Sequence, residues 1–360
     1  MIINVFNSNL QKIGVFEEMI SFIWIPRYWQ SGEFKLLARS TEKTAKLFAM
    51  ENVIIPQGKN EAGVVEYINI SLDEQGFEQI EVKGRFVTSY MDRRIVQGTY
   101  NVSNTTSWLV RRIVFLNAIT VYPAGRTIPQ LTLEENPQDL GDGVIDYTSE
   151  PWGNCLAEIE KLLMSAKLGF RAVADVAIGK HTIEIYKGVN RTAGTDSNIV
   201  FSRDFNNLLS VYKTDSTNGY HTCGWVIGKA DNSVEPPTTP FVFVEKEAQE
   251  GLSRREVKLD GADIDPADLS ETESISAALR GRGLVLLGGM NVKLSFDGNI
   301  NTRATPTYGR DFDVGDVITV RDDKLNASID LRITAAEEIY ENGAEELRLV
   351  FGETIPTRIR

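Results

Sequence analysis

The stretch GEFKLLAR, at residues 32–39, alternates apolar and polar side chains and indicates how the chain folds. Phe34, Leu36 and Ala38 fall on one face of a strand, because successive side chains of a strand point to opposite faces. Further along, residues 64–72 are rich in β-branched side chains, which favour strands. We therefore expect residues 1 to about 100 to be mostly β-sheet.

Short helices are expected between and after these strands. Residues 42–48 and 86–96 each show a short helical pattern. A clearer helix is predicted to start after Asn104 or Thr105, with basic residues on its outer side. Its apolar positions recur at helical spacing and are Leu109, Ile113 and Leu116.

A small α/β unit is predicted in the middle of the chain. An apolar stripe follows the possible helix cap Asn154, and Gly169 is expected to stop that helix. Two strand-like runs then flank Gly179 and Lys180, a pair suited to a tight hairpin turn. We therefore expect this unit to consist of a helix followed by a β-hairpin.

Two loop-like segments suggest domain boundaries. Residues 127–160 hold no Lys or Arg but eight acidic residues, with several prolines and glycines nearby. A second polar segment with three prolines lies near residue 235. We therefore expect domains at 1–150, 151–235 and 236–360.

The last third is predicted to open with a helix and continue as sheet. Ser270 and Glu273 have the spacing of a capping box, and the helix should reach Arg280, with Gly281 and Gly283 ending it. The strands that follow include a hairpin closed by Asn342 and Gly343.

The composition and charge of the chain exclude several classes of protein. The chain has 360 residues, 42% of them hydrophobic, and a net charge of −12, which works against a binder that tracks nucleic-acid phosphates. Cys155 and Cys223 suggest neither a disulfide framework nor a thiolate cage. The amino terminus lacks an export signal, and the apolar stretch at 19–26 is too short to span a bilayer, so we expect a soluble protein made in the cytoplasm, with no membrane insertion.

No pattern in the sequence predicts a catalytic, cofactor-binding or metal site. His181 and His221 are the only histidines, and a packed or solvated histidine is commoner than a catalytic one. Asp263, Asp265 and Asp268 begin like a calcium loop but lack its glycine, so a solvated acidic loop is expected.

Two regions resemble a known family. In residues 16–58 and 78–96, a G-x-F strand, a V-x-G-R strand and a helix ending in R-R-I follow one another. The matching residues are Gly32, Phe34, Val82, Gly84, Arg85, Arg93, Arg94 and Ile95. This order resembles the opening of siphovirus tail-tip hub proteins, the amino-terminal part of tail-associated proteins of phages and prophages of Gram-positive bacteria.

The carboxy-terminal third resembles the same hubs. Its matching elements are an R-R-E triplet, a G-x-G and a Y-x-x-D-(aromatic)-x-x-G-D run, and its residues are Arg254, Arg255, Glu256, Gly281, Gly283, Tyr308, Asp311, Phe312, Gly315 and Asp316. Simpler roles are open for them: Gly84 and Gly315 as turn glycines, and Asp311, Asp313 and Asp316 as loop braces.

The resemblance implies a β-rich α+β fold, with two β-barrel-like domains and a small α/β domain. It also implies a homotrimer that forms a pseudo-sixfold baseplate ring in the virion tail tip. Its neighbours would be the distal tail protein ring and other tail-tip proteins, with the tape-measure protein and DNA passing through the lumen. An acidic surface would let DNA slide without sticking.

The resemblance implies a structural protein without catalytic activity. The weak interface candidates are Arg93, Arg94, Arg254, Arg255, Glu256, Asp311, Asp313, Gly315 and Asp316. Two alternatives remain at this point: a cell-wall hydrolase that uses an Asp/Glu pair, and a carbohydrate-binding module of the host-recognition apparatus.

Overall fold

We describe a computed structural model of the chain, and the residues it describes are 1–233, 235–266, 269, 274–322, 327–341 and 343–352. The strands, in chain order, are β1 Ile3–Phe6, β2 Lys12–Phe16, β3 Met19–Ile25, β4 Glu33–Arg39, β5 Val53–Pro56, β6 Gly63–Val64, β7 Tyr67–Leu72, β8 Glu78–Arg85, β9 Asn101–Thr105, β10 Leu131–Leu133, β11 Val144–Thr148, β12 Gly169–Asp175, β13 Lys180–Tyr186, β14 Asn190–Arg191, β15 Val200–Ser202, β16 Leu208–Ser216, β17 Cys223–Gly228, β18 Phe241–Glu245, β19 Glu256–Gly261, β20 Lys293–Ile300, β21 Val317–Asp322, β22 Ala327–Glu341 and β23 Ala344–Gly352.

The described residues form fewer helices than strands. The α-helices are α1 Glu42–Leu47, α2 Thr106–Val114, α3 Cys155–Ala166 and α4 Ile275–Gly288. Short helices of other types are η1 Val87–Arg93, η2 Phe115–Ile119, η3 Ala124–Arg126 and η4 Gly251–Ser253. The expected β-rich α+β class is confirmed.

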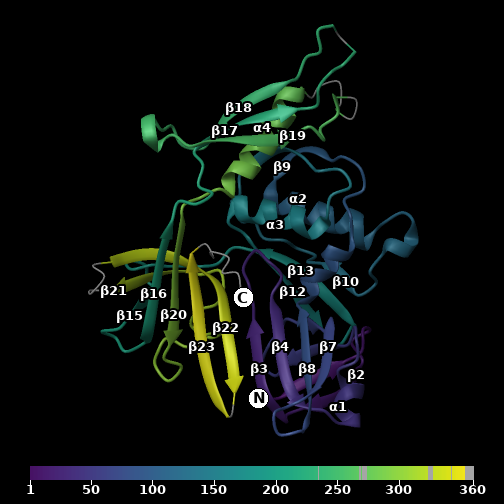
Figure 1. Ribbon diagram of the computed structural model, residues 1–360, viewed down its shortest axis with the longest axis vertical. Helices are drawn as coiled ribbons and strands as arrows, with labels where there is room; N and C mark the ends of the chain where they lie inside the picture. The colour runs from purple at the N-terminus through teal and green to yellow at the C-terminus, as the bar shows by residue number, and fades with distance from the viewer. Residues whose placement is uncertain (234, 267–268, 270–273, 323–326, 342, 353–360) are drawn as a thin grey trace.

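One long sheet organises the molecule (Figure 1). Its main path runs β16-β20-β23-β22-β3-β4-β8-β7, and every neighbouring pair along it is antiparallel. The two ends of the chain meet in the middle, where β22 pairs with β3 and Glu338 lies opposite Trp24. The path therefore joins an N-terminal half, β3-β4-β8-β7, to a C-terminal half, β16-β20-β23-β22.

The N-terminal half packs against a second sheet of order β2-β1-β5-β6. The alternation predicted at residues 32–39 explains the packing, because Phe34, Leu36 and Ala38 are all buried in the core between the two sheets. Trp24 lies at the centre, with its ring 4.1 Å from that of Phe86.

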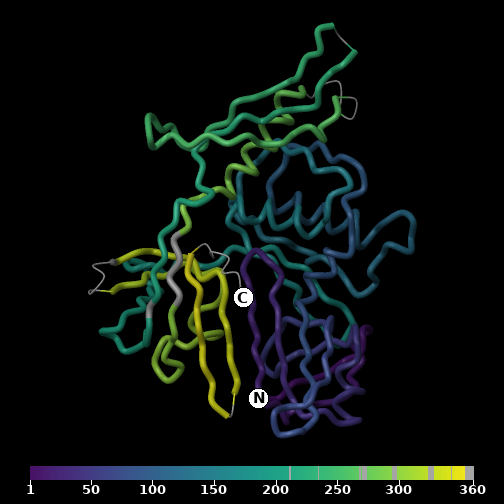
Figure 2. Tube along the Cα trace, viewed as in Figure 1, coloured from purple at the N-terminus to yellow at the C-terminus, as the bar shows by residue number. Residues whose placement is uncertain are grey.

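The C-terminal half has its own core. A short layer of β14, β15 and β21 continues from β22 and covers one side of this half. The core holds Phe201, Phe312 and Phe351. Its strands are not consecutive in sequence, since the chain leaves after β16, forms a separate unit and returns at β20 (Figure 2).

That separate unit is a three-stranded sheet, β18-β17-β19, packed on α4. Beside it, α2 and α3 pack with the β10-β13-β12 sheet in another core. The polar segment near residue 235 lies between β17 and β18, which pair in one sheet. The division into domains at 1–150, 151–235 and 236–360 stays a prediction.

Several sequence expectations hold locally. The helix after Thr105 is α2, whose first turn is capped by the Thr105 side chain. The helix behind Asn154 is α3, capped by that asparagine. Strands β12 and β13 form the hairpin predicted around Gly179 and Lys180.

Other expectations are wrong. Residues 86–96 contain a 3-10 turn, η1, in place of an α-helix. Lys167, at φ 56°, ends α3, and Gly169 already belongs to β12. The capping box at Ser270 and Glu273 lies outside the described residues.

The glycines at 281 and 283 do not end a helix, because α4 runs through both to Gly288. Packing explains their presence. A Cβ on Gly281 would lie 1.6 Å from the backbone oxygen of Asp146, and one on Gly283 would lie 2.4 Å from Val226. These glycines let α4 approach β11 and β17 closely, at the expense of helix propensity.

Candidate assembly surfaces

One face of the long sheet is uncovered in the described part of the chain. The buried side chains of β3 and β22, such as Phe22, Trp24 and Ala336, all point to the side that carries the two cores. The alternate residues Ile23 and Glu337 therefore point to the opposite side. A hollow on that side is lined by residues of both halves.

The uncovered face carries charges of both signs. Glu81 on β8 lies between two lysines, 2.7 Å from Lys35 and 2.6 Å from Lys83. On the C-terminal half, Arg348 contacts Glu346 at 3.0 Å and Glu337 at 3.7 Å. Such pairs contribute little to stability where they are exposed, but they leave the face without a strong field of one sign.

Both ends of the sheet are open edges. Within the described residues β7 pairs with β8 alone, and β16 pairs with β20 alone. Each edge exposes large apolar side chains: Ile70 is 51% and Leu72 68% exposed on β7, and Tyr212 is 69% exposed on β16. Open edges with apolar side chains are templates for pairing with another strand.

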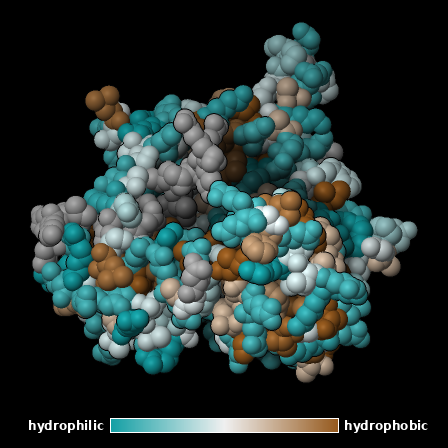
Figure 3. Space-filling model, turned by 60° about the horizontal axis from the view of Figure 1, so that its bottom comes forward, coloured by the Kyte–Doolittle hydropathy of each residue, from teal (hydrophilic) through white to brown (hydrophobic). Residues whose placement is uncertain are grey.

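The molecule shows two lobes when its lower end is turned forward (Figure 3). Hydrophobic residues interrupt the hydrophilic surface of the right-hand lobe, which belongs to the N-terminal half. The exposed apolar residues at this edge are Tyr67, Ile70, Leu72 and Phe77.

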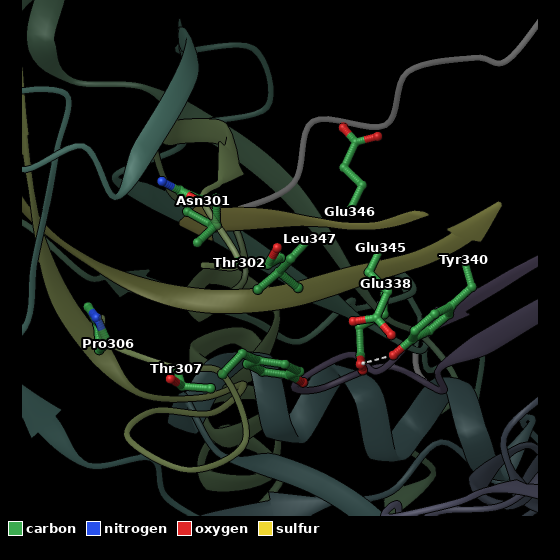
Figure 4. A pocket seen from close by; sticks show the side chains of 11 residues that line it. Asn301, Thr302, Pro306, Thr307, Glu338, Tyr340, Glu345, Glu346 and Leu347 are labelled. Atoms are coloured by element: carbon green, nitrogen blue, oxygen red, sulfur yellow. Dashed lines mark hydrogen bonds between the residues drawn. The ribbon is translucent and has the colours of Figure 1, made fainter. Parts of the chain in front are cut away.

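A buried ion pair ties the two halves together behind β22 and β3. Lys59, in the loop before β6, donates to both carboxylate oxygens of Glu338 at 2.6 Å. Tyr340 donates to the same carboxylate at 3.2 Å, and Figure 4 shows the two side chains turned toward each other at the pocket wall. The ammonium of Lys59 also lies 5.1 Å from the ring centre of Tyr308.

Two pockets adjoin this ion pair. The pocket drawn in Figure 4 and a second, more polar pocket both have Tyr308 and Glu338 in their walls. Burial raises the pKa of Glu338, and Lys59 opposes that rise. Burial also raises the pKa of Glu61, on the same pocket wall, from 4.5 to about 8, although Arg171 opposes it. The junction of the two halves therefore contains two carboxyl groups whose pKa burial raises, each with a cation nearby that opposes the rise.

The predicted interface residues fall into three groups, and no ion pair or hydrogen bond joins one group to another within the described residues. In the first, Arg93 pairs with Glu51 at 2.7 Å and lies over the ring of Tyr90. Arg94 donates to the backbone oxygens of Arg126 and Arg93 at 2.7 and 2.9 Å.

The second group lies at β19. Arg254 contacts Glu256 at 2.8 Å and lies 5.1 Å from the ring centre of Phe243. Arg255 donates to the backbone oxygen of Thr217 and lies beside Tyr220. These residues border the outer side of the β18-β17-β19 sheet.

The third group braces a turn before β21. The Asp316 carboxylate accepts from the backbone of Val189 and from Arg191, both at 2.7 Å. Gly315 has φ 101°, and a Cβ there would lie 2.5 Å from the ring of Tyr28, so only glycine fits.

The remaining aspartates of this group make local contacts. Asp311 accepts from the backbone of Thr307 at 2.7 Å and also pairs with Arg310. Asp313 accepts from the backbone of Val314. These contacts agree with the simpler role as loop braces, and an interface role for the three groups stays a prediction.

The histidines and cysteines are placed as follows. His181 is fully buried in β13, and burial lowers its pKa to about 4. Both cysteines are buried, and burial raises the pKa of Cys155 to about 12. Among the described residues no cluster of His, Cys, Asp and Glu side chains could hold a metal ion. Asp268, the third residue of the calcium-like run, lies outside them.

A membrane span is also not found among the described helices, none of which combines enough length with enough apolar character. Sequence reasoning missed the two open edges and the β22–β3 junction. The exposed apolar residues of β7 were visible in the sequence as a β-branched run, but nothing in it showed that the strand has a free side.

Comparisons with known proteins agree with this architecture. A family model described as "Siphovirus ReqiPepy6 Gp37-like protein" matches residues 2–353. A search of curated proteins finds no match.

Solved structures with a similar fold include three tail proteins. The 43 kDa tail protein of prophage MuSo2 from Shewanella oneidensis is 14% identical, with a TM-score of 0.57 over 98% of each chain. The tail protein from Neisseria meningitidis MC58 is 12% identical, with a TM-score of 0.55 over 98% of this chain and 96% of that chain. The prophage tail protein gp18 from Listeria monocytogenes EGD-e is also 12% identical, with a TM-score of 0.54 over 97% of this chain and 94% of that chain.

Proposed function

Because the chain belongs to the family of siphovirus ReqiPepy6 Gp37-like proteins, we propose that it is a structural hub of the tail tip that closes into a trimeric ring. The resemblance to tail-tip hubs drawn from the sequence agrees with this family and with the tail-protein folds it matches. The role in the particle is structural, without catalysis by this chain.

The observation that carries the proposal is the sheet with two open edges. Its main path has an even number of strands, all antiparallel, so β7 of one copy and β16 of the next run in opposite directions when the sheet continues. Pairing them satisfies free backbone groups and buries the apolar side chains at both edges. Such an interface is heterologous, and it closes into a ring when the rotation between copies is right.

The two halves support a pseudo-sixfold arrangement. Each half contributes four strands of the main path and holds its own core. Three copies would thus present six similar units around an axis, which is how a trimer could dock on a sixfold tail. The distal tail protein ring and other tail-tip proteins are the partners we propose.

The uncovered face would line the channel through which the tape-measure protein and DNA pass. The sequence suggested an acidic lumen, whereas this face pairs glutamates with lysines and arginines. A face without a strong positive field would still allow DNA to slide, because it offers no row of free cations to the phosphates.

Light scattering across a concentration series tests ring closure. We expect a mass near three times 40.1 kDa at high protein concentration. Ile70→Lys on β7 or Tyr212→Lys on β16 should shift the mass to the monomer, because a charge on an edge strand opposes strand pairing.

Leu252→Lys is the matched control, since Leu252 is 100% exposed in η4, which belongs to neither edge strand. It should leave the mass unchanged. A monomer at every concentration, or a trimer that survives both edge substitutions, would contradict ring closure by these strands.

A further inference from the structure

Three arginines, one on α2, one on η3 and one directly after η1, carry positive charge that no acidic side chain of the described residues neutralises. Arg94, Arg112 and Arg126 form no ion pair within the described residues, although the whole chain carries a net charge of −12. Their neighbours Arg93 and Arg111 differ, since each pairs with a glutamate, Glu51 and Glu134 respectively. In each of the two Arg-Arg sequences, the first arginine is therefore neutralised by a glutamate and the second is not.

Backbone carbonyl groups hold two of the three side chains in place. Arg94 donates through Nε to the backbone oxygen of Arg126 at 2.7 Å, and Arg126 donates through Nη2 to the backbone oxygen of Ile95 at 2.7 Å. Arg126 also donates to the Gln97 side chain. Neutral acceptors fix these guanidinium groups but leave their charges uncompensated.

The two fixed arginines repel each other. Burial lowers the pKa of Arg94, and the charges of Arg126 and Arg93 lower it further. An anion placed between them would relieve this repulsion, and little side-chain freedom would be lost because the geometry is already set.

Arg112 extends the same surface along α2. It lies over the exposed ring of Trp108, 5.9 Å from the ring centre, and makes no hydrogen bond within the described residues. Burial raises the pKa of Tyr100, and the charges of Arg126 and Arg112 both oppose that rise, so both arginines act electrostatically on the same phenol. Apolar side chains are exposed on α2 and in the segments next to α2, η1 and η3, and are Ile95, Trp108, Phe115 and Tyr122.

We propose that Arg94, Arg112 and Arg126, together with the exposed Trp108, form a docking surface for an acidic segment of a partner protein. Arginine and tryptophan are enriched where protein interfaces derive most of their binding energy. Carboxylates fit because a guanidinium group can donate to them in pairs. A nucleic acid fits less well, because a binder of a duplex neutralises a row of phosphates and this surface offers three unpaired cations.

This surface does not use β7 or β16, so the proposal does not depend on ring closure. A chain that stays monomeric in light scattering can still be tested for docking. Conversely, a trimer whose arginines bind nothing would leave the ring proposal intact.

The test measures binding of a fluorescein-labelled peptide of about ten glutamates to the full chain by fluorescence anisotropy at low salt, where charge pairing is screened least. We expect saturable binding that the combined change Arg94→Gln, Arg112→Gln and Arg126→Gln weakens at least about tenfold, which corresponds to about 1.4 kcal/mol. Arg112→Gln alone breaks no hydrogen bond in the chain, and it should weaken binding about threefold with the fold intact.

Arg303→Gln is the matched control, because Arg303 is exposed in the C-terminal half and its side chain has no partner within the described residues. It should bind the peptide as the unchanged protein does. Failure of the unchanged protein to bind, or equal binding by the triple variant, would overturn the proposal. A labelled DNA duplex that binds more tightly than the peptide and is weakened by Arg112→Gln would overturn it in favour of a nucleic-acid surface.

Discussion

The two halves of the long sheet have cores of similar kind but are assembled from the chain in different ways. The N-terminal half uses consecutive strands between β1 and β8. The C-terminal half combines β14–β16 with β20–β23, and β17, β18, β19 and α4 are inserted between them. The N-terminal half is therefore built from strands that are neighbours in the sequence, and the C-terminal half from strands that are far apart in it.

This difference has consequences for stability. A continuous segment that encloses its own core can hold its structure when a distant part loosens. The C-terminal half depends on β22, which pairs with β21, β23 and β3. We expect the N-terminal half to tolerate damage to the other half better than the reverse.

The largest effects should come from truncating one large aromatic residue in each core. Trp24 is 1% and Phe201 0% exposed, so replacing either by alanine should cost about 3–5 kcal/mol. Because Trp24 lies opposite Glu338 at the junction, Trp24→Ala should lower hydrogen-exchange protection in both halves. Phe201→Ala should lower it in the strands of the C-terminal half alone, because Phe201 belongs to the core of that half. Equal loss in β4 and β8 after Phe201→Ala would remove the distinction between the halves.

A smaller effect is expected at the junction itself. Lys59→Met leaves the Glu338 carboxylate, whose side chain is 9% exposed, without its cation, at a cost of about 3 kcal/mol. The double change Lys59→Met with Glu338→Leu should recover most of this loss, because no buried charge then remains. Chemical denaturation monitored by fluorescence gives both values.

Lys46→Met provides the control for the junction. Lys46 pairs with Glu42 on the surface, where their side chains are 75% and 84% exposed, so its loss should change stability by less than about 0.5 kcal/mol. An equal cost at positions 46 and 59 would show that the junction ion pair has no special role.

The smallest predicted effect is a pH dependence at the same junction. Burial raises the pKa of Glu61 from 4.5 to about 8, so in this range the folded state binds a proton that the unfolded state has lost. The stabilisation is present below the unfolded value and disappears as the pH rises toward 8. Between about pH 5 and about pH 7 the loss should be about 2 kcal/mol.

Glu61→Gln isolates this contribution, because glutamine keeps the shape but does not titrate. The slope of unfolding free energy against pH should become flatter by the amount that Glu61 contributes. An unchanged slope would mean that Arg171 and Lys59, the cations near Glu61, keep it ionised in the folded protein.

The sequence predicted the parts of the fold that depend on neighbouring residues. Alternation at Phe34, Leu36 and Ala38 and the caps at Thr105 and Asn154 are local signals, and the structure confirms each of them. The family resemblance was also correct, because it rested on the order of several short motifs.

The remainder depends on long-range packing. The sequence predicts no strand at β16 or β17, because their partners β20 and β19 lie much later in the chain. It also ended α4 at Gly281, since helix propensity alone does not reveal that β11 requires a residue without a side chain there.

The candidate surfaces could be predicted only in part from the sequence. The R-R-I motif drew attention to Arg93 and Arg94, but the structure separates them by pairing Arg93 with Glu51 and leaving Arg94 without a carboxylate. Arg112 and Arg126 had no motif to mark them. The open edges are a property of strand order and could not be recognised before β22 was seen beside β3.

Covalent cross-linking across the two edges tests the central claim most directly. Asn69 on β7 and Thr214 on β16 are both exposed and belong to the side of the sheet that faces away from the cores. A chain with Asn69→Cys and Thr214→Cys, treated with a short thiol-reactive linker, should give dimers and then trimers. The native cysteines are buried and should not interfere.

We expect the series of cross-linked species to end at three copies, because the third link closes the ring. Either single substitution should give at most a dimer. Monomers alone would contradict edge pairing. A series that continues beyond three copies would contradict closure into a trimer.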